Sequence, residues 1–270
     1  MACSGQAPET ESPSGDQELS AGGRKPEIIG VITGLQTEAD LVRGIAKSDA
    51  PDHDVRVMCL GPGPQKASEA AKRLLTVGAT RLASFGLAGG LKMSLWPGTA
   101  IVARTVVAAD GTHYPADATW HGRLIGGLIG DDEVVDGELV EAAEPVTTVA
   151  EKRKLYETSQ AGAVDMESAA VAAEAARASM PFIALRAIAD PADRNIPPAA
   201  LSALRADGTA SSMRAIGHAL ARPQDIIRLV RLGLDSRAAF ATLRRVLTRT
   251  GALTGVPLTA RRRVRRRQKI

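Results

Sequence analysis

Aromatic residues are scarce in this chain of 270 residues, which has two Trp, two Tyr and three Phe. Its 44% hydrophobic content can still bury one sizeable core, which Ala, Val, Leu and Ile must build. The two cysteines, Cys3 and Cys59, lie far apart, which argues against a disulfide framework and favours a reducing cytoplasm. No apolar run reaches the roughly 20 residues of a membrane helix, and no secretory signal is expected at the start. The sequence therefore predicts a protein that does not span a membrane.

Histidine is equally rare, and this bears on cofactors. The four histidines are scattered along the chain, and neither they nor the cysteines form a cluster with metal-ligand spacing. We therefore expect no metal site and no cofactor.

Charge is unevenly distributed along the chain. The net charge is +4, but residues 222–270 hold 14 Lys and Arg against two acids, so the rest of the chain is acidic. Such a split predicts that the basic end has an acidic partner of its own.

The pattern along the chain predicts three parts. Residues 1–25 are rich in Ser, Gly, Pro and Glu and are expected to be a disordered leader. In residues 26–222, apolar strand-like runs alternate with segments whose apolar residues recur at helical spacing, which predicts an α/β domain. Residues 223–270 form a basic amphipathic helical tail. The expected strands of the domain are 28–33, 55–60, 81–86, 99–109, 145–149, 163–166 and 182–189, with a glycine-rich turn at 86–90.

Two carboxylates follow apolar strands of this domain. Glu167 lies where the run Ala163–Met166 meets an Ala-rich helix, and Asp190 ends the run Phe182–Ala189. In open α/β sheets ligands collect at the carboxyl ends of strands, so the pair predicts a polar small-molecule site. Taken singly, Glu167 could be an ordinary acid at a helix amino terminus, and Asp190 a turn cap before Pro191.

These segments resemble the purine nucleoside phosphorylase and nucleosidase superfamily, over about residues 28–193. The resemblance rests on Val164-Asp165-Met166-Glu167-Ser168 and on Arg186 to Asp193. It implies a three-layer fold whose central sheet is mixed, mostly parallel and covered by helices on both faces. It also implies that Glu167 and Met166 hold a ribose and that Asp190 protonates the leaving purine. Members commonly form homo-oligomers, which we therefore expect.

The resemblance assigns supporting roles as well. Glu38 matches the residue that activates the attacking water in methylthioadenosine/adenosylhomocysteine nucleosidases, although an ordinary first-turn helix acid is an equal alternative. The loop beside the sugar and nucleophile corresponds to Gly86, Ala88, Gly89 and Gly90. Arg186 is expected to brace the carboxylates of the site.

A narrower resemblance is to the hopanoid-associated phosphorylases. It rests on four segments: residues 61–64, 84–90, 163–168, and Arg222-Pro223 with Asp235-Ser236-Arg237-Ala238-Ala239. It implies release of adenine from adenosylhopane. A soluble methylthioadenosine/adenosylhomocysteine nucleosidase is the first alternative, and a non-catalytic lipid- or nucleic-acid-binding protein on the same fold is the second.

The nucleophile stays open at this stage. The bacterial purine phosphorylases carry a Gly-Asp-Pro-x-x-Arg phosphate motif after the first strand, where this chain reads Thr33-Gly34-Leu35-Gln36-Thr37-Glu38, and an Arg where it has Ser84. Both departures favour water over inorganic phosphate as co-substrate. Leu87 and Ala189, however, stand where the nucleosidases usually have Ser.

The basic tail has three interpretations. Residues 224–249 could pack on the domain with their arginines in water, or lie as an interfacial helix on anionic lipid at the cytoplasmic face of a membrane. Residues 261–269 could bind nucleic acid, but without aromatic residues such binding would be nonspecific.

Overall fold

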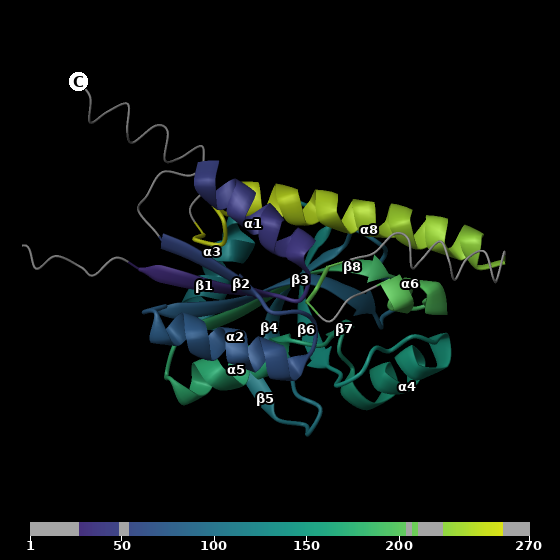
Figure 1. Ribbon diagram of the computed structural model, residues 1–270, viewed down its shortest axis with the longest axis horizontal. Helices are drawn as coiled ribbons and strands as arrows, with labels where there is room; N and C mark the ends of the chain where they lie inside the picture. Colours follow the sequence, from purple (N-terminus) through teal and green to yellow (C-terminus); the bar gives the residue numbers. More distant parts are fainter. Residues whose placement is uncertain (1–26, 49–53, 204–206, 210–223, 256–270) are drawn as a thin grey trace, which may run out of the picture.

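A computed structural model of the chain describes residues 27–48, 54–203, 207–209 and 224–255. The predicted leader and the basic run at 261–269 lie outside the described residues. Within them, the structure is a layered α/β domain with one sheet at its centre (Figure 1). The strands of that sheet are β1 (Ile28–Thr33), β2 (Asp54–Cys59), β3 (Arg81–Gly90), β4 (Ala100–Val107), β5 (His113–Pro115), β6 (Val134–Glu141), β7 (Ala163–Asp165) and β8 (Phe182–Asp190). The helices are α1 (Gln36–Ser48), α2 (Pro64–Thr76), α3 (Ala118–Gly127), α4 (Val149–Ser159), α5 (Ser168–Arg177), α6 (Pro198–Ala203) and α8 (Gln224–Arg249).

The sheet is mixed and mostly parallel, as the sequence predicts. Strands run in the order β2-β1-β3-β7-β6-β4-β5, and β8 pairs with both β3 and β4. Five of the eight pairings among the described strands are parallel. Because β8 joins β3 to β4 while β7 and β6 join them on the other side, these five strands pair in a closed ring, which brings the ends of β3, β7 and β8 together.

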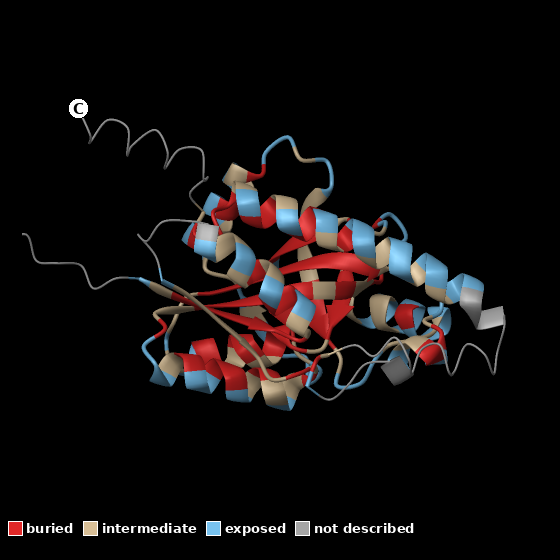
Figure 2. Ribbon diagram, turned by 45° about the horizontal axis from the view of Figure 1, so that its top comes forward, coloured by how far each residue is buried: buried red, intermediate tan, exposed pale blue. Residues whose placement is uncertain are grey.

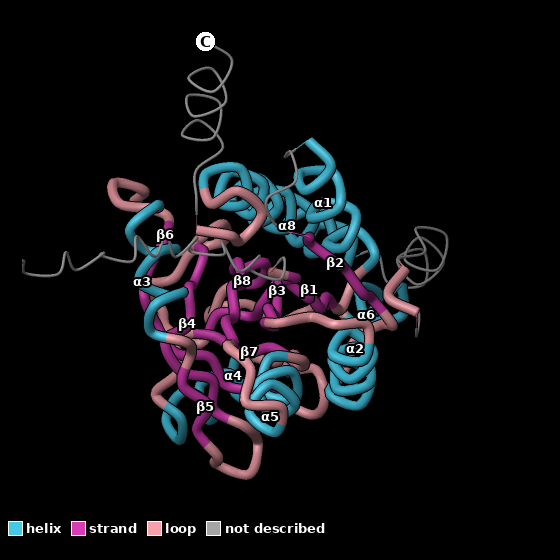
Figure 3. Tube along the Cα trace, turned by 90° about the vertical axis from the view of Figure 1, so that its left-hand side faces the viewer, coloured by secondary structure: helices cyan, strands magenta, loops and turns pink. Residues whose placement is uncertain are grey.

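Helices cover both faces of the sheet. Helices α2 and α5 lie on one face, where their alanines pack on the strands, and α1, α3 and α8 lie on the other (Figures 1 and 3). Figure 2 shows the buried residues gathered in the sheet and on the inner sides of these helices. Small alanines at the helix contacts let the layers approach closely, which is how a chain poor in aromatics fills its core.

The glycine-rich segment 86–90 is not the expected turn but the second half of β3. Gly89 and Gly90 pair antiparallel with Val164 and Ala163 of β7, after a register shift at Ala88. Glycines without side chains let the strand bend at this shift and pass from β8 to β7. The bend closes the ring and sets Gly89 beside both Asp190 and Val164.

The prediction of a strand at residues 145–149 is also wrong. This segment instead leads into helix α4, because Thr148 caps α4 in a capping box with Glu151. The strand of this region is β6, which the sequence did not reveal because Gly137 and Asp136 interrupt its apolar pattern. A Cβ at Gly137 would lie 3.2 Å from Ile101, so this glycine permits close contact with β4.

Helix α8 joins the core through its carboxy-terminal half. Ala239, Leu243, Val246 and Leu247 are buried in the cluster that includes Ile183 and Leu185 of β8. Arg245 lies 2.9 Å from Asp131 and 2.6 Å from Glu133, and Arg249 lies 3.1 Å from Asp131. This half of the predicted tail therefore packs on the domain. In the other half, an apolar stripe stays in solvent: Ile227, Val230 and Leu234 are 64%, 58% and 58% exposed.

No helix among the described residues is long and apolar enough to cross a membrane.

Candidate active site

One cavity of about 280 Å³ gathers most of the predicted site residues. It opens where β3, β7 and β8 end, and its lining includes Glu38, Ala88, Gly89, Met166, Glu167, Arg186 and Asp190. Gly86 and Gly90 do not line it: Gly86 lies against Glu38, and Gly90 against Ile188 and the chain after Asp190. The ring of strands brings together predicted site residues as distant in sequence as Glu38 and Asp190, which are 152 positions apart.

Glu167 is buried, with 5% of its surface exposed, at the residue before α5. Its carboxylate does not cap that helix. Instead, Oε1 accepts a hydrogen bond from the backbone N–H of Gly63 (3.1 Å), and Oε2 lies 3.2 Å from Nη2 of Arg186. Burial raises the pKa of Glu167, and the guanidinium of Arg186 opposes that shift. Gly34 leaves the space for this carboxylate, since a Cβ there would lie 2.8 Å from Oε1.

Glu38 is buried in the first turn of α1 and accepts three backbone hydrogen bonds. Oε2 accepts from Gly34 (3.1 Å) and Leu35 (2.9 Å), so the carboxylate does cap its own helix. Oε1 accepts from the N–H of Leu87 on β3 (2.8 Å), which aims the group into the cavity. Burial raises the pKa of Glu38 to about 7, against the lowering effects of Arg186 and of these hydrogen bonds. A carboxylate with such a pKa is suited to take a proton near neutral pH.

Replacing Gly86 with alanine should disturb Glu38 selectively. A Cβ at this position would lie 2.5–2.7 Å from all three carboxyl atoms of Glu38, so the acid must leave its donors. Because a displacement of about 1 Å can cost about 10²-fold in rate, we expect a loss of that order in kcat for nucleoside cleavage. The matched control is Gly130→Ala, because Gly130 also has a positive φ (79°, against 157° at Gly86) but a Cβ there meets nothing within 4 Å. Equal kcat values for the two variants would contradict a role for the position of Glu38.

Asp190 ends β8, with its side chain 14% exposed, and lies beside a buried lysine. Nζ of Lys152 on α4 lies 2.6 Å from Oδ2 of Asp190. Burial raises the pKa of Asp190 to about 6, and the ammonium of Lys152 limits the rise. Gly89 again makes room, since a Cβ there would lie 3.1 Å from Oδ2. A carboxyl group with this pKa can hold a proton at near-neutral pH and give it to a leaving group.

Arg186 contacts two of the buried carboxylates. It is 1% exposed, and its Nε lies 2.7 Å from Oδ2 of Asp165 while Nη2 donates to Ser84 Oγ at 2.7 Å. Its contact with Glu167 completes a buried network in which one cation serves two carboxylates.

Sequence reasoning missed Lys152, Leu232 and Ser236. Lys152 shares a helix face with Leu155 and Tyr156, three and four residues on, and that spacing is a signal that it points inward. Leu232 and Ser236 of α8 line the cavity, so the helix that the sequence sets apart as a tail forms part of its wall.

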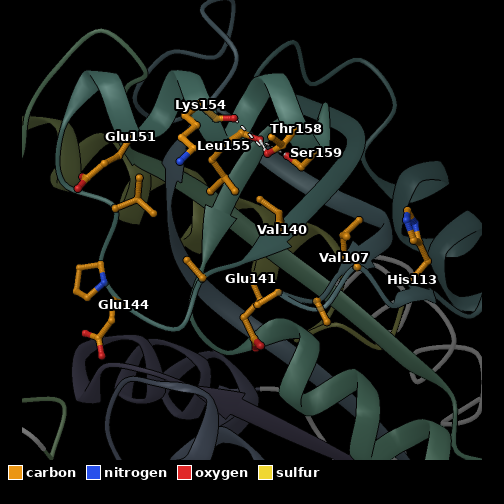
Figure 4. Close-up of a pocket in the computed structure, with 16 residues that line it drawn as sticks. Val107, His113, Val140, Glu141, Glu144, Glu151, Lys154, Leu155, Thr158 and Ser159 are labelled. Carbon is orange, nitrogen blue, oxygen red and sulfur yellow. Dashed lines mark hydrogen bonds between the residues drawn. The ribbon is translucent and has the colours of Figure 1, made fainter.

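A second and larger cavity, of about 660 Å³, adjoins the first (Figure 4). Its lining is mostly apolar and includes Val107 of β4, Val140 of β6 and Leu155 of α4. Ala142, Glu144, Pro145 and Val146, in the segment between β6 and α4, line both cavities. None of the predicted catalytic groups lines the larger one.

The acidic cavity at the ends of β3, β7 and β8 is the candidate active site of this α/β domain. The model of the Phosphorylase superfamily matches residues 37–222, and the chain belongs to that superfamily. Its structure is similar to a 5′-methylthioadenosine/S-adenosylhomocysteine nucleosidase from Neisseria meningitidis, with a TM-score of 0.63 and 18% identity over 85% of this chain and 99% of that one. It is also similar to the futalosine hydrolase of Helicobacter pylori, with a TM-score of 0.56 and 18% identity over 62% of this chain and 89% of that one. At such identities the likeness shows the fold alone. No curated protein matches the chain.

Proposed function

We propose that the protein hydrolyses the N-glycosidic bond of a purine nucleoside and releases the base. The observation that carries this proposal is the meeting of three carboxyl groups around one cavity: Glu38 and Glu167 are buried, and the side chain of Asp190 is 14% exposed. Asp190 donates a proton to N7 of the purine as the bond breaks. Glu167, with Met166 beside it, accepts hydrogen bonds from the ribose hydroxyls and stabilises the positive charge that develops on the sugar. Glu38 orients the nucleophile and takes its proton.

The charge of the cavity supports water as that nucleophile. Five carboxyl groups line it, from Glu38, Glu144, Asp165, Glu167 and Asp190, and Arg186 is the one cation among its described lining residues. That guanidinium is occupied by Asp165 and Glu167, and the N–H of Leu87 already donates to Glu38. A phosphate dianion would meet net negative charge and few donors, whereas water would not.

We propose adenosylhopane as the substrate. Beyond the carboxylates, the cavity wall is apolar, with Leu35, Leu87, Val146, Ile196 and Leu232 among its lining residues. The larger cavity across the segment from Ala142 to Val146 is lined by apolar residues and by charged ones such as Glu151 and Lys154, and its apolar part gives room for a bulky apolar group on the sugar. A triterpenoid on the 5′ carbon of the ribose has that chemistry.

Adenine release from adenosylhopane in detergent tests the proposal, with adenosine and methylthioadenosine in parallel and phosphate present or absent. We expect release from adenosylhopane at a rate that phosphate does not change. A requirement for phosphate would make the enzyme a phosphorylase. Release only from the small nucleosides would favour the second candidate, a methylthioadenosine/adenosylhomocysteine nucleosidase, which is the activity named for the Neisseria meningitidis protein of the same fold.

The exposed half of α8 supports a place for the enzyme at an anionic lipid surface. Ile227, Val230 and Leu234 recur at helical spacing in solvent, and the exposed Arg231 and Arg237 flank them. Leu232, on the opposite side of the same helix, lines the catalytic cavity, so lipid bound at this stripe would lie one helix diameter, about 10 Å, from the cavity.

The double variant Val230→Ser with Leu234→Ser should bind vesicles of anionic phospholipid about tenfold less tightly, because two exposed apolar side chains no longer enter the headgroup region. Sedimentation with vesicles measures the partition, and raising the salt should weaken wild-type binding. Point changes are preferable to deleting residues 223–270, because α8 also supplies core residues. Ile129→Ser, at a residue 77% exposed elsewhere, is the control. Unchanged partition of the double variant would leave α8 as a packing helix.

A further inference from the structure

Lys152 is a fully buried lysine in the middle of an otherwise polar helix. It is 0% exposed, while Glu151, Arg153 and Lys154 around it on α4 are exposed. Lysine is almost never fully buried unless its charge is paired. Here the pairing is with the residue to which we assign the proton transfer.

The ammonium group holds both the end of β8 and the chain that follows. Nζ lies 2.6 Å from Oδ2 of Asp190, and it donates hydrogen bonds to the carbonyl oxygens of Pro191 (2.8 Å) and Arg194 (3.0 Å). The ammonium group therefore makes one ion pair and two hydrogen bonds within one short segment. This arrangement holds the carboxyl group of Asp190 in one place at the end of the cavity.

The other charged groups near Asp190 do not replace this cation. Asp235 of α8 faces Asp190 and raises its pKa, and Arg194 is paired with Asp235. Arg228 and Arg231 of α8 line a small cavity beside Asp190, but the pKa of Asp190 responds to its burial and to the charges of Lys152 and Asp235. The positive charge in direct contact with Asp190 is that of Lys152.

We propose that Lys152 is a positioning residue for nucleoside cleavage, which fixes the Asp190 carboxyl group against the purine and stabilises the negative charge that it acquires. This inference rests on the proposed function. In the step concerned, the glycosidic electron pair moves to the purine, the proton of Asp190 moves to N7, and Asp190 becomes a carboxylate. The ammonium beside it meets that new charge in a buried setting, where the interaction is strong.

Lys152→Met tests the proposal through the pH profile of kcat/KM. Without the adjacent cation, the buried Asp190 keeps its proton to higher pH, so the basic limb of the profile should move up by about 1–3 pH units. At pH values below the basic limbs of both the wild type and the variant, Asp190 is protonated in each. There kcat/KM of the variant should be lower by about tenfold or more, because its acid is weaker and less well placed. Arg153→Met, which removes a cation at the exposed neighbouring site on α4 and lines neither cavity, should leave the profile where it is.

Lys152→Gln separates the charge from the hydrogen bonds, because its amide can still donate to the carbonyl oxygens. We expect it to fold with a thermal midpoint nearer the wild type and to show the same shift of the basic limb. A folded variant whose limb does not move would overturn the proposal. Failure of both variants to fold would also overturn it, in favour of a lysine that serves the fold alone. Asp190→Asn distinguishes the two proposals: if that variant is fully active, the assignment of the acid has failed, whereas its inactivity beside an unmoved Lys152→Met profile removes the role of Lys152 alone.

Discussion

Replacement of Asp190 by asparagine should lower kcat/KM for purine release by about 10²–10⁴-fold, the usual contribution of a positioned general acid. The amide has nearly the same size and can still accept a hydrogen bond, but it has no acidic proton for N7. Because burial holds the pKa of Asp190 at about 6, the wild-type group retains a proton in part of the molecules near neutral pH, and this capacity is what the variant loses. Binding of the intact nucleoside should change far less, since the ribose contacts belong to Glu167.

The control for this variant is Asp193→Asn. Asp193 lies three residues further along the same segment with its side chain 44% exposed, and its ion pair with Arg194 is long, at 3.9 Å. We expect wild-type activity from it. Initial rates of base release with a nucleoside that carries a poor leaving group give the sharpest comparison, because proton transfer to the base then limits the rate. Wild-type rates from a folded Asp190→Asn protein would remove Asp190 from the role of acid.

The sequence indicates the site better than it indicates the strands that build it. Glu167 and Asp190 are predicted from sequence because each follows an apolar strand. Strands β7 and β8 are not parallel to each other, and their ends meet because β3 bends from one to the other. Strand β6 escapes the same reasoning because Gly137 resembles a loop residue, whereas its absent side chain serves close contact with Ile101. The glycines of β3 mislead in the same way. Their spaces are filled by carboxylates, with Glu38 against Gly86 and Asp190 against Gly89.

Contacts between distant segments account for what the sequence does not reveal. Lys152 and Asp190 are 38 positions apart and meet because α4 packs beside the end of β8. Leu232 reaches the cavity because Leu243 and its neighbours anchor α8 on the sheet. A segment with basic residues and apolar residues at helical spacing, such as α8, is equally compatible with exposure to solvent, binding to lipid or packing in the core. In α8 the structure divides these roles along one helix, with core residues in one half and an exposed stripe in the other.

Replacement of Arg186 by methionine should be the most destabilising single change in the site. The guanidinium is 1% exposed and lies 2.7 Å from Asp165 and 3.2 Å from Glu167, both buried. Removing one partner of a buried ion pair leaves the other charge uncompensated, at a cost of about 3–5 kcal/mol in the free energy of unfolding. Urea unfolding at pH 8 measures this loss. Arg153→Met, which breaks an ion pair whose two side chains are 77% and 66% exposed, should change stability by about 0–1 kcal/mol.

The pH dependence of the Arg186→Met effect tests its cause. Arg186 lowers the pKa values of Glu38 and Glu167, so its contribution is present where these groups are ionised and is lost as the pH falls and they take up protons. The difference in unfolding free energy between wild type and variant should therefore shrink from pH 8 to pH 5. A difference that stays constant over this range would mean that Arg186 stabilises the domain through its ion pair with Asp165 or through packing, and not through its effect on Glu38 and Glu167. In that case Arg186 would not affect the pKa of Glu38, which burial raises to about 7. The activity of the variant would then fall only as far as its stability falls.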